Sequence, residues 1–504
     1  MLILSDLRAT LFQALKHSLV LGVGWMVASA IRLCLLPIFT RHLDTAEYGT
    51  VAFLDTAVGL ARILLVAGLS SSIVRFFNEK HSPAYQKAVV STGMQILLFM
   101  ACAAAALSVF TVKPMGSLLL GSPDKSALVL LAAGEMIVGL PRLAAESFLT
   151  ATRKTTALSI IIASQAICSA AVNLYLVVYA GLGVRGMLTG NFLVALTFSM
   201  AMTGWTFKKV GWCFDRALLV DMVRFGFPMV PALLAAAAMH QADRLFIRSF
   251  SSIEEVGIYS IAYTFPFMLS SILAQNFERI WGASLMYEAA RAPDAGYQLR
   301  RMCSYTMFII GIALFGTAVG ARSIVSVFTG PSFHEAYRYM APIALGVWIY
   351  TLHIFVRTGV VLTKKTYLFP VNYGIACGIN IALNFILVPY YGGMGAAWTS
   401  VITYTWFSIG GYFLYRHCYK LEIEWGRLAR FMVVCVGVVI LRGLVPTAGL
   451  SATLAADLGF FIIVPLALFF WPGFVTAGEK SAILELTLRT LPGFLRPKNT
   501  CGNA

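Results

Sequence analysis

Long apolar runs, separated by short polar intervals, alternate along almost the whole chain. A helix needs about 20 mainly apolar residues to cross the hydrocarbon core of a bilayer. By that length the pattern predicts six membrane-spanning helices up to about residue 210, six more up to residue 420, and two further ones before residue 474. The expected spans are 18–39, 48–73, 88–111, 127–149, 156–179, 184–206, 225–247, 256–277, 303–327, 341–361, 367–389, 394–415, 429–446 and 453–472.

Two pairs of short segments recur at nearly the same separation, which indicates an internal repeat. Residues 43–53 (LDTAEYGTVAF) match 251–261 (SSIEEVGIYSI) at an offset of 208, and 180–190 (AGLGVRGMLTG) match 389–399 (PYYGGMGAAWT) at an offset of 209. Two halves of six helices would share one orientation in the membrane, because six is an even number. The alternative is that short glycine-containing turns recur by chance.

The expected fold is an all-α polytopic membrane protein with about 14 transmembrane helices, arranged as two six-helix lobes related by the repeat plus two C-terminal helices. The expected division is an N-lobe (helices 1–6) over 1–210, a C-lobe (helices 7–12) over 211–420, two extra helices (13 and 14) over 421–474, and a cytoplasmic amphipathic tail over 475–504. No cleaved targeting segment is expected, because the first 15 residues lack the short apolar core of a signal peptide.

The amino-acid composition is that of a membrane protein. Hydrophobic residues make up 59% of the chain and charged residues 12%, against about 25% charged residues in a typical soluble domain. The nine cysteines and seven histidines are dispersed, with no CxxC or HExxH spacing. No glycine-rich phosphate-binding loop is present either. We therefore expect no disulfide framework, no metal site and no cofactor.

The basic residues predict the orientation. If the N-terminus is cytoplasmic, 25 Lys and Arg residues lie on the cytoplasmic side of the expected spans and 8 on the opposite side. Cytoplasmic loops carry the excess of positive charge in membrane proteins, so both termini are expected in the cytoplasm. Basic loops facing anionic headgroups also explain the net charge of +16 without a nucleic-acid partner.

Three stretches carry a family resemblance. Residues 35–60 (LLPIFTRHLDTAEYGTVAFLDTAVGL), followed by GLSSSIVRFF, resemble the opening of the polysaccharide transporter family, which comprises bacterial flippases for lipid-linked oligosaccharides. This family is part of the multidrug/oligosaccharidyl-lipid/polysaccharide exporter superfamily. Residues 225–263 resemble its seventh helix and the loop into the eighth, and 181–190 (GLGVRGMLTG) resemble its turn between helices five and six.

The resemblance implies a twelve-helix core in two lobes around a central cavity, with two extra helices. It also implies a non-enzymatic flippase of the bacterial cytoplasmic membrane. Such a protein moves a polyprenyl-diphosphate-linked oligosaccharide from the inner to the outer leaflet by alternating access, for surface or exopolysaccharide biosynthesis. A polysaccharide polymerase or other assembly proteins are candidate partners. The alternative function is a cation-coupled multidrug exporter of the same superfamily.

Charged residues inside the expected spans are the candidate site. They are Arg32, Asp55, Arg62, Glu135, Arg142, Glu146, Asp243, Arg244 and Arg357. A charged side chain at the bilayer centre costs about 2.5–3.5 kcal/mol on insertion scales, so it normally faces the protein interior or a wet cavity. Asp243, Arg244 and Arg357 lie near span ends, where we expect their side chains to reach the headgroups.

Arginine suits a diphosphate ligand, because its planar guanidinium stays charged and binds two phosphate oxygens at once. We expect Arg32, Arg62 and Arg142 to form a substrate-binding site in the cavity. The alternative is that each neutralises a carboxylate, most simply Arg32 with Asp55 or Glu135, and Arg142 with Glu146 at i,i+4.

Asp55 and Glu135, the deepest carboxylates, are candidates for coupling export to a proton or sodium gradient. Ion pairing with an arginine is the alternative for both. A membrane glycan polymerase or glycosyltransferase usually needs a sizeable outer loop with charged residues. The longest outer loop expected here, 112–126, is short and nearly neutral. The sequence therefore favours a transporter over an enzyme.

Overall fold

The computed structural model describes residues 2–419, 421–446, 449–471 and 474. These residues are predominantly helical and include no β-strand. Twelve of their helices are long and apolar enough to cross a membrane, which confirms the expected all-α polytopic membrane fold. One of the twelve, Leu368–Tyr415, covers two expected spans, so the count of fourteen stays a prediction. The expected tail at 475–504 lies outside the described residues.

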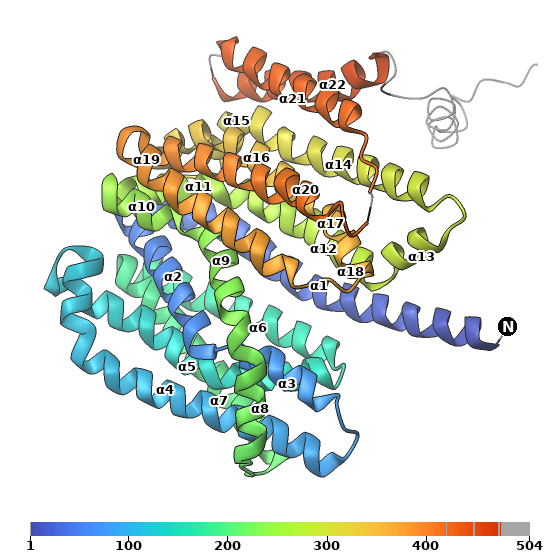
Figure 1. The fold of residues 1–504 in the computed structure, drawn as a ribbon. Helices are drawn as coiled ribbons and strands as arrows, with labels where there is room; N and C mark the ends of the chain where they lie inside the picture. Colours follow the sequence, from blue (N-terminus) through green and yellow to red (C-terminus); the bar gives the residue numbers. More distant parts are fainter. Residues whose placement is uncertain (1, 420, 447–448, 472–473, 475–504) are drawn as a thin grey trace, which may run out of the picture.

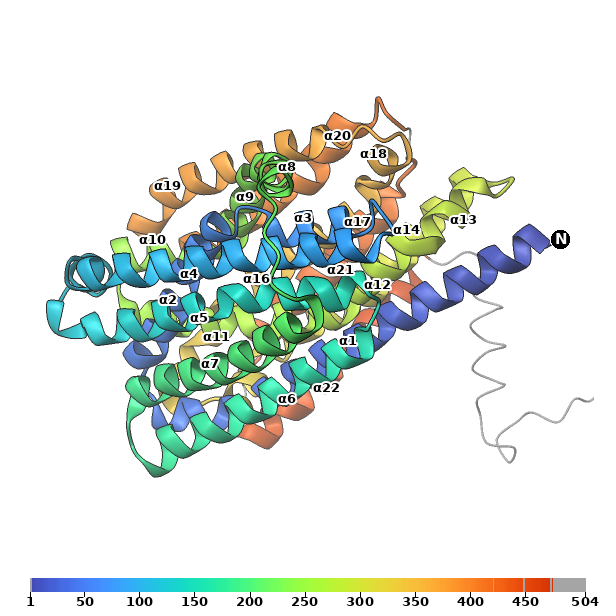
Figure 2. The same cartoon turned by 90° about the horizontal axis from the view of Figure 1, so that it is seen from below.

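Helices of the first half form one group, in the lower part of Figure 1, with α1 running beside them. Figure 2 shows α1 alongside α6, and these two helices pack closely. The bounds are α1 Leu2–His42, α2 Thr45–Val66, α3 Leu69–Phe77, α4 Pro83–Leu120, α5 Ser126–Ala151, α6 Thr155–Leu174 and α7 Gly183–Val210.

The second half begins with α8 and α9, which lead up to a second group in the upper part of Figure 1. Its bounds are α8 Arg216–Gly226, α9 Val230–Gln241, α10 Asp243–Phe250, α11 Ile253–Ser270, α12 Asn276–Ile280, α13 Met286–Arg291, α14 Ala295–Val319, α15 Ala321–Phe328, α16 Tyr337–Thr351, α17 His353–Val356, α18 Thr358–Leu362, α19 Leu368–Thr405 and α20 Gly411–Tyr415. Two further helices follow, α21 Trp425–Leu444 and α22 Leu450–Phe470.

Two of the expected spans are interrupted, one of them at residues with a positive φ. The span expected at 48–73 divides into α2 and α3 at Ala67 and Gly68, whose φ angles are 47° and 74°. A Cβ at Gly68 would overlap the carbonyl group of Gly226, so only glycine allows this approach. The span expected at 225–247 is also interrupted, because α8, α9 and α10 are separate helices.

Equivalent contacts in the two halves support the internal repeat. Glu47 accepts a hydrogen bond from the backbone N–H of Val184 at 3.3 Å, and Glu255 accepts one from the N–H of Gly393 at 2.7 Å. These pairs are separated by the two offsets found in the sequence. The residues before the donors are Gly183 (φ 53°) and Gly392 (φ 54°), a left-handed conformation that favours glycine.

The N-terminal ends of α2 and α11 cross at two glycines. A Cβ at Gly49 would overlap the carbonyl oxygen of Ile253, and a Cβ at Gly257 would overlap that of Thr45. The two contacts are repeat equivalents, because Thr45 and Ile253, like Gly49 and Gly257, are 208 residues apart. Helix backbones approach this closely only where small residues meet. We call these four residues the glycine crossing; it joins the two halves of the protein.

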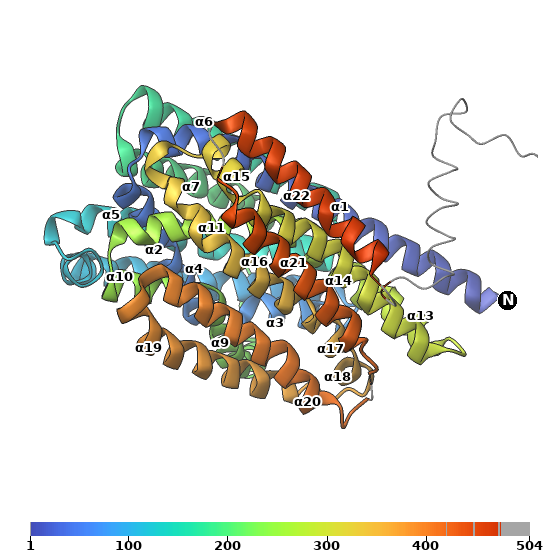
Figure 3. The same ribbon diagram turned by 90° about the horizontal axis from the view of Figure 1, so that it is seen from above.

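The helices α21 and α22 cover α14 and α15, as seen from above in Figure 3. Arg442 of α21 pairs with Asp457 of α22 at 2.5 Å, and both side chains are buried. The Ser323 hydroxyl of α15 also donates a hydrogen bond to Asp457. Such additional hydrogen bonds help a buried ion pair to offset the loss of hydration. The two helices are therefore tied to the second half of the protein.

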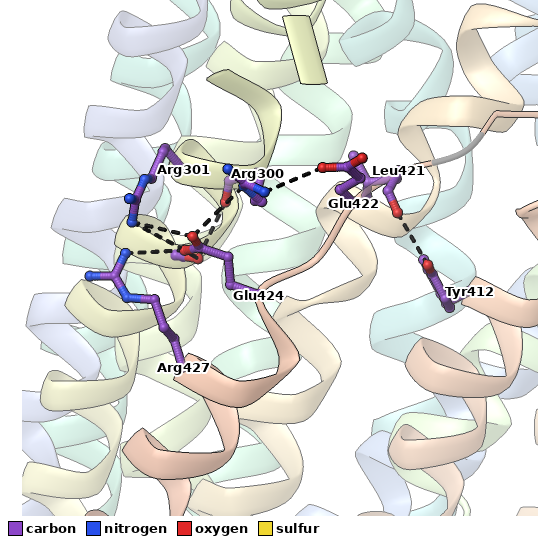
Figure 4. Close-up of polar contacts among 8 residues, drawn as sticks. Arg300, Arg301, Tyr412, Leu421, Glu422, Glu424 and Arg427 are labelled. Atoms are coloured by element: carbon purple, nitrogen blue, oxygen red, sulfur yellow. Dashed lines mark hydrogen bonds and ion pairs between the residues drawn. The ribbon is translucent and has the colours of Figure 1, made fainter. Parts of the chain in front are cut away.

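A second tie lies at the start of α21 (Figure 4). Glu424 accepts contacts from Arg301 at 3.2 Å, from Arg427 at 3.1 Å and from the Ser304 hydroxyl at 2.6 Å, with Arg300 at 3.7 Å. The Glu424 side chain is only 14% exposed. Because Arg300, Arg301 and Ser304 belong to α14, this carboxylate connects α14 to α21.

We expect Glu424→Ala to lower the free energy of unfolding by about 3 kcal/mol, because it removes the largely buried carboxylate that contacts Arg301, Arg427 and Ser304. The measurement is thermal unfolding in detergent, followed by the apparent Tm. Glu335→Ala is the matched control, since Glu335 pairs with Arg338 at 2.7 Å on an exposed surface. That pair is worth about 0–1 kcal/mol. Equal losses in the two variants would contradict a structural role for Glu424.

Candidate functional site

Six charged side chains of the expected spans lie on three helices of the first half. Arg32 is on α1, Asp55 and Arg62 are on α2, and Glu135, Arg142 and Glu146 are on α5. The first three side chains are exposed, and the three on α5 are partly buried. The helices α2 and α5 pack against each other. We call these six residues the N-lobe charge cluster.

The cluster is one electrostatic unit. The charges of Arg32 and Arg62 both act on Asp55. Glu135 interacts with Asp55, Arg142 and Arg62. The structure therefore brings together all five site residues expected from the sequence. Three arginines face three carboxylates, so the cluster as a whole is close to neutral.

Arg142 has protein partners of its own. Its Nε lies 3.0 Å from Glu146, as the i,i+4 spacing predicts, and its Nη1 donates to Gln165 at 2.5 Å. These contacts hold the guanidinium between α5 and α6. Arg142 is therefore less free than the other two arginines to bind an added ligand.

Arg32 and Arg62 have no such partner. Within the described part of the chain, neither guanidinium forms an ion pair with a carboxylate. Both side chains are exposed, and the nearby acidic charge of Asp55 acts on them over a longer distance. Two unpaired guanidinium groups next to one carboxylate can receive an anionic ligand.

Arg244 of α10 joins this group from the second half of the chain. Its charge acts on Asp55, while its Nε donates to the Ser260 hydroxyl at 3.0 Å. Its guanidinium also lies 5.2 Å from the centre of the Tyr263 ring, a cation–π distance. The expectation that Arg244 reaches the headgroups is wrong, because its guanidinium is held against Ser260 and Tyr263 of α11.

Asp243 is also placed differently from the expectation. Its side chain is fully buried and accepts hydrogen bonds from Tyr259 at 2.7 Å, Ser400 at 2.7 Å and Asn384 at 3.1 Å. Three donors from α11 and α19 replace the hydration that a carboxylate loses on burial. The side chain cannot reach a headgroup, so that expectation is wrong. The sequence carried one signal, the acidic residue itself, but not its partners.

A cavity of about 610 Å³ lies within the second half of the protein. Its lining includes His240 and Gln241, which come shortly before Asp243 and Arg244 in the chain. Its wall comes from α9, α11 to α12, α16 to α17, and α19. Arg357 lines it and pairs with Glu278 at 2.6 Å, so its guanidinium does not extend to the headgroups as expected. We call this space the C-lobe cavity.

The C-lobe cavity borders the N-lobe charge cluster. Gln241 of its wall would lie 3.5 Å from a Cβ at Gly59, which is on α2 between Asp55 and Arg62. On α1, a Cβ at Gly22 would lie 3.6 Å from Nη1 of Arg279, another residue of the wall. Arg244, whose charge acts on Asp55, lies 5.2 Å from the ring centre of Tyr263 in the wall. The cluster and the cavity are therefore neighbouring parts of one site.

No group of three His, Cys, Asp or Glu side chains in the described residues is arranged to hold a metal ion. The polar groups at the site are guanidinium, carboxylate, phenol, amide and hydroxyl groups and the imidazole of His240. These groups bind anions and hydroxyls by hydrogen bonds.

The fold has well-matched solved relatives. The structure titled "Lipid II flippase MurJ, inward closed conformation" superposes with a TM-score of 0.71 over 89% of this chain and 98% of that chain, at 13% identity. A multidrug resistance MATE family transporter of the MOP superfamily, in an inward-facing conformation, superposes with a TM-score of 0.60 over 81% of this chain and 97% of that chain, also at 13% identity. At such low identity these similarities establish the fold alone.

Sequence comparison establishes the family. The "Succinoglycan biosynthesis transport protein ExoT" of Rhizobium meliloti (strain 1021) is 24% identical over 343 residues. The match spans 66% of this chain and 66% of that relative, slightly less than two thirds of its length. The sequence model of the family described as "Polysaccharide biosynthesis protein" matches residues 14–279, which is more than half of the chain. The chain therefore belongs to the polysaccharide biosynthesis protein family.

Proposed function

We propose that this protein moves a polyprenyl-diphosphate-linked oligosaccharide from the inner to the outer leaflet of the bacterial cytoplasmic membrane. The proposed movement serves surface or exopolysaccharide biosynthesis. The observation that carries the proposal is the pair of unpaired arginines, Arg32 and Arg62, on the membrane-spanning helices of a polysaccharide biosynthesis family member. The similarity to a succinoglycan transport protein and the shared fold with a lipid II flippase agree with this function.

In this proposal the diphosphate binds where Arg32 and Arg62 converge on Asp55. Each guanidinium offers parallel N–H donors that match two phosphate oxygens. An exposed arginine facing lipid would be unfavourable by about 2.5–3.5 kcal/mol, whereas one facing an aqueous space between the halves is not. The hydrophobic polyprenyl chain stays in the lipid while the headgroup crosses. Arg142 shapes the wall through Glu146 and Gln165 and contributes less directly.

Alternating access requires the two halves to separate at one membrane face and close at the other. The glycine crossing is a candidate for one of these closures, because it brings α2 and α11 into backbone contact at a single end. By the distribution of basic residues, this end faces outward and both termini are cytoplasmic. The break at Ala67 and Gly68 offers a point at which α3 can change its angle to α2.

We also propose Asp55 and Glu135 as ion-coupling residues. Both carboxylates belong to the N-lobe charge cluster and interact electrostatically with Arg62. Binding of a cation to either carboxylate would therefore change the electrostatic environment of Arg62. A proton or sodium ion bound to one of these carboxylates would make the net charge of the N-lobe charge cluster more positive. Binding of the cation at one membrane face would strengthen diphosphate binding there, and release of the cation at the other face would weaken it.

The runner-up is a cation-coupled multidrug exporter, which the shared fold with MATE transporters favours. The unpaired arginines argue against it, since an organic cation would meet like charge at Arg32, Arg62 and Arg244. In either case the protein acts as a transporter and makes or breaks no covalent bond. Polysaccharide polymerases and other assembly proteins are the proposed protein partners.

Arg32→Ala is the direct test of the flippase proposal. In cells from which the gene is deleted, we expect a polyprenyl-diphosphate-linked sugar to accumulate, and wild-type protein to clear it. Loss of one charge-assisted contact of about 1.5–3 kcal/mol should reduce clearance about tenfold or more. Mass spectrometry of lipid extracts measures the accumulated species.

Arg185→Ala is the matched control, because Arg185 is an exposed arginine outside the cluster. It should restore clearance in full at the same expression level. If Arg32→Ala clears the lipid as well as this control does, Arg32 has no substrate role. If no lipid-linked sugar accumulates in the deletion strain, the exporter becomes the better explanation and drug efflux is measured instead.

A further inference from the structure

The walls of the C-lobe cavity combine ring faces with hydrogen-bonding groups. Phe267 and Tyr350 supply aromatic surface, and Gln241, Gln275 and Ser270 supply amide and hydroxyl groups. Its volume of about 610 Å³ is in the range of small-ligand sites, about 300–1,000 Å³. Amphipathic rings with a few convergent polar groups match a sugar, which presents C–H faces and hydroxyl edges.

The cavity also contains an excess positive charge. Its charged wall residues are Glu278, Arg279 and Arg357, and the first and last of these pair at 2.6 Å. This pairing leaves Arg279, whose Nη1 lies 3.5 Å from the side-chain oxygen of Asn276. Among the described residues, no carboxylate forms an ion pair with Arg279. The neutral amide of Asn276 accepts a hydrogen bond but does not balance the charge.

A cation in a partly enclosed site is stabilised by an anion that brings both a charge and hydrogen-bond acceptors. The planar guanidinium fits an oxyanion with two adjacent oxygens. A neutral sugar in the cavity would cover Arg279 without supplying such a group. A sugar with a carboxylate would satisfy it.

We propose that the C-lobe cavity is a saccharide-binding subsite selective for a carboxylate-bearing sugar, with Arg279 as the carboxylate ligand. The proposal rests on the proposed flippase function and adds the chemical class of glycan. The N-lobe charge cluster, bordering the cavity through Gln241 and Gly59, then holds the diphosphate. The sugars nearest the diphosphate occupy the cavity.

One other source of the same chemistry is the substrate phosphate, which is also an oxyanion. The two sources are separated by using ligands that share the diphosphate and differ only in the sugar. Suitable probes are farnesyl diphosphate without sugar, farnesyl-diphosphate-linked glucose, and farnesyl-diphosphate-linked glucuronic acid. Binding to the purified full-length protein in lipid nanodiscs is measured by isothermal titration calorimetry.

We expect wild-type protein to bind the glucuronyl probe about tenfold more tightly than the glucosyl probe, the effect of one charge-assisted contact. Arg279→Gln should reduce this ratio to near one and leave the Kd of farnesyl diphosphate unchanged. Gln241→Ala, which keeps the cavity charge, should weaken both sugar-bearing probes and preserve their ratio. Arg185→Gln is the matched control and should behave as wild type.

Equal wild-type affinity for the glucosyl and glucuronyl probes would overturn the proposal. So would an equal loss for all three probes in Arg279→Gln, since that result places Arg279 on the phosphate. The underlying flippase proposal fails in a different way. In that case wild-type protein does not bind farnesyl diphosphate, or Arg62→Gln leaves that binding unchanged.

Discussion

Replacing Gly49 with alanine is expected to abolish transport. The added Cβ would overlap the carbonyl oxygen of Ile253, and a backbone atom of a packed helix cannot move aside as a flexible side chain can. The ends of α2 and α11 would have to separate. If the glycine crossing is one of the two closed states of the transport cycle, the variant cannot complete the cycle. Clearance of lipid-linked sugar in the deletion strain measures the effect.

Gly257→Ala should reproduce this loss, because its Cβ would overlap the carbonyl oxygen of Thr45 in the equivalent contact. Gly204→Ala is the matched control, since a Cβ there meets nothing within 4 Å. In that variant transport should be retained and stability unchanged or slightly higher, by up to about 1 kcal/mol. Normal clearance by Gly49→Ala would show that the close approach of α2 and α11 is not needed.

Replacing Asp243 with alanine is expected to give the largest loss of stability. The substitution leaves the hydroxyl donors of Tyr259 and Ser400 without their acceptor in a fully buried site, while the Asn384 amide keeps its hydrogen bonds to Asn380. Each unsatisfied buried group costs about 1–3 kcal/mol, so we expect a total near 3 kcal/mol or more. The measurement is the apparent Tm of the purified protein in detergent, which should fall by about 3 °C or more.

Asp221→Ala is the control, because Asp221 is an exposed acidic residue on α8. Its apparent Tm should stay within the error of wild type. Asp243→Asn provides a second comparison, since it preserves size but replaces one acceptor oxygen with a donor. It should be destabilised to an intermediate degree. An Asp243→Ala protein as stable as the Asp221→Ala control would show that the three hydrogen bonds do not stabilise the fold.

The membrane-spanning helices were predictable because the bilayer imposes their length. About 20 apolar residues are needed per crossing whatever the neighbours are, and helices occur at the expected places, including α4, α5 and α7. Breaks within spans were not predictable. Ala67 has a positive φ although nothing in its side chain favours one. Its conformation depends on the packing of Gly68 against Gly226, which lies far away in the sequence.

The candidate site was likewise predictable only in part. The charged residues were evident from the sequence, because a charge in an apolar run is costly unless something receives it. Their partners were not evident. Arg244 and Arg357 looked like residues that reach the headgroups, yet Arg357 pairs with Glu278, 79 positions earlier in the chain. The aromatic wall of the C-lobe cavity could not be distinguished by sequence from ordinary core residues.

By itself the sequence determined that the chain is helical and spans a membrane many times, and it indicated a repeat at an offset near 208 residues. These properties follow from local composition and spacing, which act through the length of an apolar run. Only the tertiary structure decided which charges are paired, which are open and where the two halves meet. Those outcomes depend on side chains such as Asp243 and Ser400, 157 residues apart, being brought within hydrogen-bond distance by packing. Local patterns carry no information about that distance.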